Sequence, residues 1–357
     1  MKAPFFDNFK ACKPRKKIFL QRNSCKAWLC ILLMSLFAFV SAFGCTSAQV
    51  EMQEDPAHTQ ARYVIGVSFP TMKLIYRQTM YEILEQNFIN AKEKGIEFIV
   101  YDADGSQQRQ NQDILDLVEY GVDGIILIPY TTDGPVSAIQ YANEKGIPVI
   151  TVDNVVEARA SAQVISFVGA DHYRMGKQSA ELLLSVLEER FPHADKWNVI
   201  QLTGIPGASG TIDRGIAIDD MLMNTDRVRL IGSFNAEFTR ENARSVMEDC
   251  LLAFDEIHGV ICQNDLMALG CYDAIEAVGK LDEIIVIGID GQEEVVSKMV
   301  EGGLHGTVIQ YPNMILKGVD VLCDYLDGKP IQECYYLETD IITQGQAQEY
   351  LDKDLPW

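Results

Sequence analysis

The sequence of 357 residues predicts an α/β protein built from two lobes, each with a doubly wound parallel sheet. Short apolar runs next to glycine recur along the chain, and residues 284–291 (IIVIGIDG) are one of them. A run of this length is typical of a strand buried on both faces of a parallel sheet. The runs alternate with amphipathic segments of helical period, and this order implies right-handed βαβ crossovers.

The first series of elements begins near Tyr63. Its first helix, expected over residues 76–94, has Met80 and Leu84 near the helical period and stops at Gly95. The series reads as strands over residues 63–67, 96–101, 124–128 and 147–152, with helices over residues 76–94, 107–119 and 135–145.

A second series follows residues 161–169, which we interpret as a crossing between the lobes. Its helices are expected over residues 173–189, 211–223, 240–253, 266–278, 293–301 and 314–326. Its strands are expected over residues 197–202, 228–234, 259–262, 284–289, 306–309 and 334–337. The two series look like two copies of one architecture, although no repeat is visible residue by residue.

The N-terminal region has the pattern of an export signal. Residues 1–26 hold eight basic side chains and one acidic one, and residues 27–43 carry no charge. A positive segment followed by an apolar run and small residues is typical of a secretory signal. Cys45, after Gly44 and before Thr-Ser, resembles the end of a bacterial lipobox, so lipidation of Cys45 competes with soluble release and with an uncleaved anchor. We therefore expect a leader over residues 1–45, a polar tether over residues 46–61 and an exported body.

Charge and composition exclude several classes of function. The net charge is −21, and because residues 1–26 contribute +7, the remainder carries −28. Such an acidic body would repel nucleic acid and anionic lipid surfaces. The histidines are scattered without metal spacing, and no nucleophile elbow, phosphate loop or dinucleotide motif is present. We expect no metal, no cofactor and no catalytic residues, and so not an enzyme.

Five cysteines lie beyond the leader, an odd number without CxxC spacing. Cys262 falls inside an apolar strand, where a free cysteine behaves as a small hydrophobe. We expect no disulfide framework.

Polar residues follow several apolar runs, at the edge where open α/β sheets bind ligands. Alone, Asn264 or Asp290 could cap the next helix, and Arg214 could pair with Asp213 or Asp219 on its own helix. The full set combines carboxylates, amides, a guanidinium and aromatic rings, and comprises Ser68, Asp102, Asp104, Tyr130, Asp153, Asn154, Arg214, Phe238, Asn264, Asp290 and Gln310. Planar groups of this kind can each take two vicinal hydroxyls, and aromatic rings pack on apolar C–H faces, so the set suits a sugar.

Several segments, in their order and spacing, resemble the ribose/galactose group of periplasmic sugar-binding proteins, which share the type I periplasmic binding fold with the effector cores of lac-repressor-type regulators. The resemblance runs from about residue 63 to about residue 342. It is carried by GVDGIILIP (121–129), GIPVITVDN (146–154), GIPGASGTIDRGIAI (204–218), CQNDLMALG (262–270), VIGIDG (286–291) and HGTVIQYP (305–312). It implies sugar contacts at Asp153, Arg214, Phe238, Asn264, Asp290 and Gln310.

The chain departs from this family in two places. Asn154 follows Asp153 where the family often has arginine. Ribose binders stack the sugar on a phenylalanine pair after the first strand, whereas residues 68–78 (SFPTMKLIYRQ) place Tyr76 and Arg77 in a manner closer to the Trp-Arg arrangement of furanose or hexose binders. Ser68, Tyr76, Arg77 and Asn154 complete the candidate ligand set, and ribose itself is not to be assumed as the ligand.

The resemblance implies an exported solute-binding protein that closes two lobes around one monosaccharide (a pentose, hexose or furanose) and delivers it, as a monomer, to an ABC permease. The hinge would have crossings near residues 167–170, 310–311 and 338–339. The lobes would span residues 62–168 plus 311–338 and residues 169–310 plus 339–357. One alternative is a sensor lobe that presents a sugar or a furanosyl autoinducer to a membrane receptor. A remote alternative is a secreted glycosidase using Asp153 and Asp290.

Overall fold

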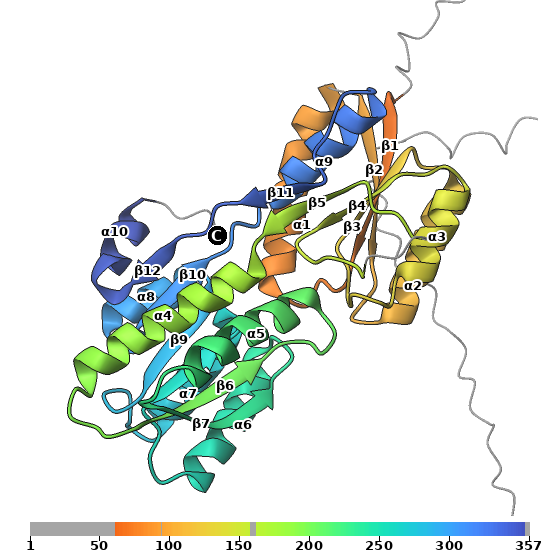
Figure 1. Cartoon of the computed structure of the whole chain (residues 1–357). Coiled ribbons are helices and arrows are strands. Elements are labelled where there is room, and N and C mark those ends of the chain that lie inside the picture. The colour runs from red at the N-terminus through yellow and green to blue at the C-terminus, as the bar shows by residue number, and fades with distance from the viewer. Residues whose placement is uncertain (1–60, 94, 158–161, 354–357) are drawn as a thin grey trace, which may run out of the picture.

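The computed structural model describes residues 61–93, 95–157 and 162–353, so the expected leader, most of the tether and Cys45 lie outside the described residues. Two lobes make up this part of the chain (Figure 1). The N-terminal lobe contains strands β1 (Tyr63–Phe69), β2 (Ile96–Asp102), β3 (Gly124–Leu127), β4 (Val149–Val152), β5 (Ser166–Ala170) and β11 (Cys334–Leu337). Its helices are α1 (Ile75–Glu93), α2 (Gln107–Tyr120), α3 (Val136–Glu144) and α9 (Met314–Leu326).

The C-terminal lobe has the same plan. Its strands are β6 (Trp197–Thr203), β7 (Val228–Asn235), β8 (Gly259–Cys262), β9 (Ile285–Asp290), β10 (Gly306–Ile309) and β12 (Ile341–Thr343). Its helices are α4 (His172–Arg190), α5 (Ser209–Met223), α6 (Arg240–Ala253), α7 (Asp265–Ala277), α8 (Glu293–Glu301), the 3₁₀ turn η1 (Gln344–Gln346) and α10 (Ala347–Asp352).

Each sheet has six strands, in the orders β11-β5-β4-β3-β1-β2 and β12-β10-β9-β8-β6-β7. The ladders are parallel except for the β10–β12 pair, which is antiparallel. The predicted fold class, two α/β lobes with mainly parallel sheets, is confirmed. The sequence patterns missed β12, η1 and α10, because these short elements contain no apolar run long enough to stand out. They also missed β5, since residues 161–169 were interpreted only as a crossing, whereas Ser166–Ala170 form a strand between β4 and β11 before the chain enters the other lobe.

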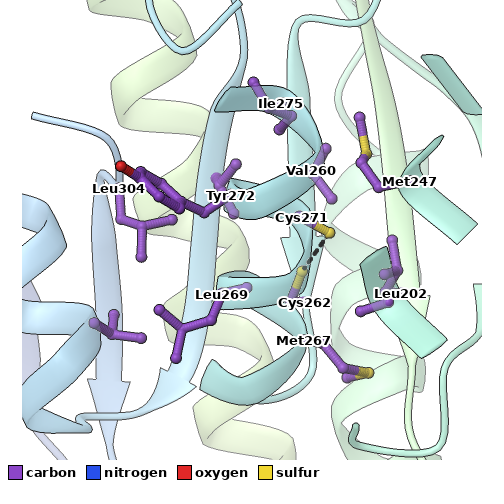
Figure 2. Packing of buried hydrophobic residues seen from close by; sticks show 14 of the residues in the cluster. Leu202, Met247, Val260, Cys262, Met267, Leu269, Cys271, Tyr272, Ile275 and Leu304 are labelled. Atoms are coloured by element: carbon purple, nitrogen blue, oxygen red, sulfur yellow. Dashed lines mark hydrogen bonds between the residues drawn. The ribbon is translucent and has the colours of Figure 1, made fainter. Parts of the chain in front are cut away.

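Both faces of each sheet are covered, as the uninterrupted apolar strands require. In the N-terminal lobe, α1 and α9 pack on one face and α2 and α3 on the other (Figure 1). Figure 2 shows the C-terminal core, in which α7 packs side chains such as Leu269 and Ile275 against the sheet. The fully buried Cys262 and Cys271 belong to this core, with their Sγ atoms 3.7 Å apart and both free.

The chain passes between the lobes at three places. β5 leads into α4, β10 leads into α9, and β11 leads into β12. Gln310 and Tyr311 lie in the second passage, between a strand of one lobe and a helix whose Met314 and Ile315 belong to the core of the other. Among the described residues, no helix is both long and apolar enough to cross a membrane.

Candidate ligand site

A cavity lies between the two lobes, with about 50 Å³ open to the centres of water molecules. Its lining comes from both lobes and from the passage at Gln310, and consists of Leu74, Tyr76, Arg77, Asp153, Asn154, His172, Gly210, Arg214, Phe238, Asn264, Leu266, Asp290 and Gln310. Every ligand residue proposed from the sequence is in this lining except Ser68, which is fully buried at the end of β1. The structure brings these side chains together, while their binding of a ligand stays a prediction.

Besides Ser68, three residues of the wider polar set lie outside the cavity lining. Asp102 accepts hydrogen bonds from the backbone N–H groups of Met72 (3.1 Å) and Asp104 (2.9 Å), and so supports a turn. Asp104 pairs on the surface with Lys73 at 2.7 Å, and the backbone N–H of Tyr130 donates to Gln110 at 2.8 Å.

A buried ion pair forms the N-terminal side of the cavity. Nη2 of Arg77 lies 2.5 Å from Oδ2 of Asp153, and both side chains are less than a tenth exposed. Asp153 has a φ of 68°, a left-handed conformation that costs a non-glycine residue energy. Burial acts to raise the pKa of Asp153, but the charge and hydrogen bond of Arg77, together with the charge of Arg214 and the nearby His172, outweigh it and hold the pKa below its usual value. Asp153 is therefore an ionised hydrogen-bond acceptor.

Gln310 joins that ion pair to the C-terminal lobe. Its Nε2 donates to Oδ1 of Asp153, and its Oε1 accepts from Nη2 of Arg214. Arg214 also donates from Nη1 to the carbonyl of Gln263 at 2.5 Å. The local alternative, an ion pair of Arg214 on its own helix, is not adopted, because the guanidinium bonds to Gln263 and Gln310 and the residue is only 4% exposed.

Asn154 makes a second connection between the lobes. Its Oδ1 accepts from Ser209 Oγ at 3.1 Å and from the N–H of Gly210 at 3.2 Å, both at the start of α5. Its Nδ2 donates to the carbonyl of Pro129 at 3.0 Å. These contacts hold the lobes together beside the cavity.

Phe238 and Asn264 line the C-terminal side. Phe238 has a φ of 61°, and its ring lies against Gly204, where an added Cβ would be only 1.9 Å from the ring. Asn264 caps α7 by accepting from the N–H of Met267 at 3.0 Å, and its Nδ2 donates to the Phe238 carbonyl at 3.2 Å. The capping interpretation of Asn264 is thus correct, and the same side chain also lines the cavity.

Asp290 ends β9 with a φ of 140°, a third strained non-glycine residue in the lining. Burial raises the pKa of its carboxyl group well above the usual value, against the opposing effect of the nearby Arg214 charge. Strained backbone persists only where the surrounding structure fixes it, and such residues concentrate at functional sites. Asp153, Phe238 and Asp290 meet that description at one cavity.

Three buried polar atoms in the lining have no hydrogen-bond partner among the described residues: Nη1 of Arg77, Nε of Arg214 and Nδ1 of His172. The carbonyl of Asp153 lies 2.9 Å from Nε2 of His172, so Nε2 carries the proton and Nδ1 is a bare acceptor. Burial lowers the pKa of His172 to about 4, which keeps the ring neutral. The sequence did not single out His172, because it follows a polar residue at a helix start and belongs to no apolar run.

A second cavity, of about 360 Å³, lies at the other end of the C-terminal lobe, beside Phe191, Phe254 and His258. Within the described part of the chain, its lining contains neither a strained non-glycine residue nor an unpartnered buried polar atom. The cavity between the lobes is therefore the candidate site.

The sequence of residues 65–330 matches the protein-family model described as the periplasmic binding protein domain. This chain belongs to that family. Membership confirms the predicted resemblance and implies an extracytoplasmic location.

Named relatives and solved structures agree with the family. The ribose import binding protein RbsB of Bacillus subtilis (strain 168) is 29% identical over 311 residues, which are 86% of this chain and 95% of the relative. A Mycobacterium smegmatis protein in complex with β-D-fucofuranose has a TM-score of 0.77 and 26% identity, covering 82% of this chain and 95% of that one. The arabinose ABC transporter binding protein of Shewanella sp. ANA-3, bound to α- and β-L-arabinofuranose, has a TM-score of 0.76 and 25% identity with the same coverage. The Bacillus and Shewanella proteins are sugar-binding transport proteins by name.

Proposed function

We propose that this protein captures one monosaccharide between its lobes outside the cytoplasm and delivers it to an ABC importer. The observation that carries the proposal is the convergence of Asp153, Arg214, Asp290 and Gln310, from both lobes and the passage between them, on one cavity. The ion pair of Arg77 with Asp153 fixes the geometry on one side.

The chemistry of the cavity favours a neutral polyhydroxylated ligand. Two guanidinium groups (Arg77 and Arg214) and two carboxyl groups (Asp153 and Asp290) line the cavity, so the hydroxyl groups of one ligand meet both hydrogen-bond donors and acceptors. The unpartnered nitrogens of Arg77 and Arg214 can donate to hydroxyl oxygens, and Nδ1 of His172 can accept from a hydroxyl. A sugar that satisfies these atoms removes a cost of about 1–3 kcal/mol for each neutral one and more for a charged one.

The size of the cavity favours a single ring. Water needs about 10–15 Å³ by the same measure, so about 50 Å³ holds only a few water molecules and leaves no room for an oligosaccharide. Two of the similar solved structures hold furanose sugars. We therefore place furanose forms of pentoses and 6-deoxyhexoses first among the candidates.

Binding would favour the closed arrangement only as far as the sugar contacts it better than the open one. In the closed form both lobes contact the one ligand, and these contacts give the sugar a higher affinity for the closed form than for the open one. Hinge closure of this kind is the behaviour for which periplasmic binding proteins are the standard example. An importer could then distinguish the loaded, closed protein from the open one.

A ligand panel tests the proposal. The purified exported body is heated with arabinose, fucose, galactose, ribose, fructose, xylitol and myo-inositol, and hits are titrated by calorimetry. At least one compound should raise the melting temperature, by mass action on the folded state. No shift with any of them, together with unchanged sugar in an overnight incubation, would contradict sugar binding; consumption of a sugar would indicate an enzyme.

We also propose that Cys45 is lipidated and that the lipid anchors the body to the membrane. Cell fractionation of the wild type and of the Cys45→Ser variant tests this. The wild type should sediment with membranes and the variant should not, and mass spectrometry should find the lipid on Cys45. Equal distribution of the two proteins would show that the anchor lies elsewhere or is absent.

A further inference from the structure

Asp265 is a fully buried carboxylate behind the cavity and is not part of its lining. It begins α7, directly after Asn264. Its Oδ2 accepts from the backbone N–H groups of Gly291 and Gln292, each at 2.8 Å, and its Oδ1 accepts from Oγ1 of Thr307 at 2.7 Å. All three donors belong to the β9–β10 region of the chain, and none belongs to α7.

An aspartate in the first turn of a helix often acts only on the helix, through the helix dipole. The contacts here do not fit that role alone. The helix is already capped by Asn264, and both oxygens of Asp265 are directed away from α7, toward β10 and the segment after β9. The backbone of β9 also makes room for the carboxylate, since a Cβ on Gly288 would lie 2.1 Å from Oδ1.

The two amides that Asp265 holds come immediately after Asp290. Asp290 itself has the strained φ of 140° and lines the cavity. Such a conformation relaxes unless neighbouring contacts fix it. Asp265 accepts from the amides of the next two residues, and the Gly291 amide also donates to Oγ1 of Thr307 at 3.1 Å, a hydroxyl that Asp265 itself holds.

We infer that Asp265 is a positioning residue for ligand binding: it clamps the backbone at Gly291 and Gln292 so that Asp290 faces the ligand at a fixed place relative to Asn264. The role in binding rests on the proposed function, whereas the clamp itself is a property of the ligand-free protein. Because the carboxylate acts as a hydrogen-bond acceptor, an amide oxygen at the same position can replace it for the two backbone donors.

Two variants separate positioning from charge. Asp265→Ala removes the acceptors and should lower sugar affinity about 10–100-fold, the usual effect of leaving buried donors unpaired. Asp265→Asn keeps one acceptor oxygen and should stay within about fivefold of wild type. Equal affinity of Asp265→Ala and wild type would overturn the inference, and so would an equal loss in both variants, since that would point to charge.

A matched control addresses general destabilisation. Leu269→Ala truncates a fully buried side chain one turn further along the same helix, α7, and leaves the hydrogen bonds of Asp265 to its three donors in place. It should lower the melting temperature while sugar affinity stays within about twofold. If Leu269→Ala weakens binding as much as Asp265→Ala does, Asp265 has a structural role only. Thr307→Val removes one donor to Asp265 and one acceptor of the Gly291 amide, but it leaves both backbone hydrogen bonds of Asp265 in place. It should give a smaller loss of affinity, and it tests the clamp if Asp265→Ala folds poorly.

A double-mutant comparison tests whether Asp265 acts through Asp290. In an Asp290→Asn background, the further change Asp265→Ala should cost less than about threefold, because the group being positioned has already been altered. Additive losses would show that Asp265 acts independently of Asp290.

Amide hydrogen exchange tests the clamp in the protein without ligand. Asp265→Ala should raise the exchange rates of the Gly291 and Gln292 amides at least tenfold, while the Ala268 amide, bonded to the Asn264 carbonyl within α7, keeps its rate. Asp265→Asn should leave the rates of Gly291 and Gln292 near those of wild type. Unchanged exchange rates at Gly291 and Gln292 in Asp265→Ala would overturn the clamp, whether or not a sugar binds. If no sugar binds the wild type, that result counts against the proposed function and leaves the clamp standing.

Discussion

Ser209 Oγ, at the start of α5 in the C-terminal lobe, donates a hydrogen bond over 3.1 Å to Oδ1 of Asn154 in the N-terminal lobe. The same oxygen accepts from the N–H of Gly210, so one amide side chain links the two lobes beside the cavity. We expect this link to couple closure of the lobes to capture of the ligand.

Asn154→Ala should weaken sugar binding by about 1–3 kcal/mol, because the closed form loses two contacts that the open form does not make. Calorimetry measures the affinity, and small-angle scattering without ligand should show a larger open population. Asn143→Ala is the control, because Asn143 exchanges similar hydrogen bonds with Gln163 inside one lobe, at 3.1 and 2.7 Å. An affinity loss without a change in lobe opening would argue against the coupling.

Asp153→Asn should cost about 3–5 kcal/mol in free energy of unfolding, because it leaves the buried Arg77 guanidinium without its counter-charge. It should also abolish sugar binding at micromolar protein. Urea denaturation measures the first effect and calorimetry the second. Asp104→Asn breaks surface pairs with Lys73 and Arg109 and should change the free energy of unfolding by less than about 1 kcal/mol. Similar losses in the two variants would contradict the assignment of a buried pair.

Gly204→Ala should displace the Phe238 ring, since the added Cβ would lie 1.9 Å from it. Overpacking of this kind costs about 1–3 kcal/mol, and we expect at least a tenfold loss of sugar affinity. The control is Gly345→Ala, where the added Cβ meets nothing within 4 Å. Wild-type affinity in Gly204→Ala would show that Phe238 takes no part in binding.

His305 predicts a pH dependence of stability that is separate from the cavity. Its Nδ1 accepts from the N–H of Val286 at 3.2 Å, and burial lowers its pKa from 6.5 to about 4. Between these values the unfolded chain binds more protons than the folded one, so this contribution to the free energy of unfolding is present above pH 6.5 and is lost as pH falls toward 4. The full loss is about 3 kcal/mol.

Urea denaturation at several pH values checks this. Asp265, with a pKa raised to about 6, contributes in the opposite direction between pH 3.8 and 6, so the comparison is between variants at each pH. His305→Gln should be less stable than wild type at pH 7, and the gap should close by pH 4, with sugar affinity at pH 7 unchanged. A gap that is independent of pH would contradict the expected titration of His305.

Hydrophobic periodicity and composition were sufficient to predict two α/β lobes. The apolar runs of β8 and β9 were correctly interpreted as buried strands, from their length and flanking glycines, and the residues after them marked the edge where Asn264 and Asp290 lie. Element boundaries agree within two residues for most helices; α7, for instance, begins at Asp265 where residue 266 was expected. The short elements after residue 337 were missed because they form on a surface supplied by β10 and α8, which no local pattern records.

The sequence by itself determined the fold class and the polar residues that end the strands, because hydrophobic periodicity and residue type are local properties. Only the tertiary structure decided how those residues are used: that Arg214 reaches Gln310 instead of an aspartate on its own helix, that Asn154 links the lobes, that His172 lines the cavity and that Asp265 lies behind it. These pairings join residues that are far apart in the chain or in separate lobes, so they follow from the way the two sheets meet and not from any local sequence pattern.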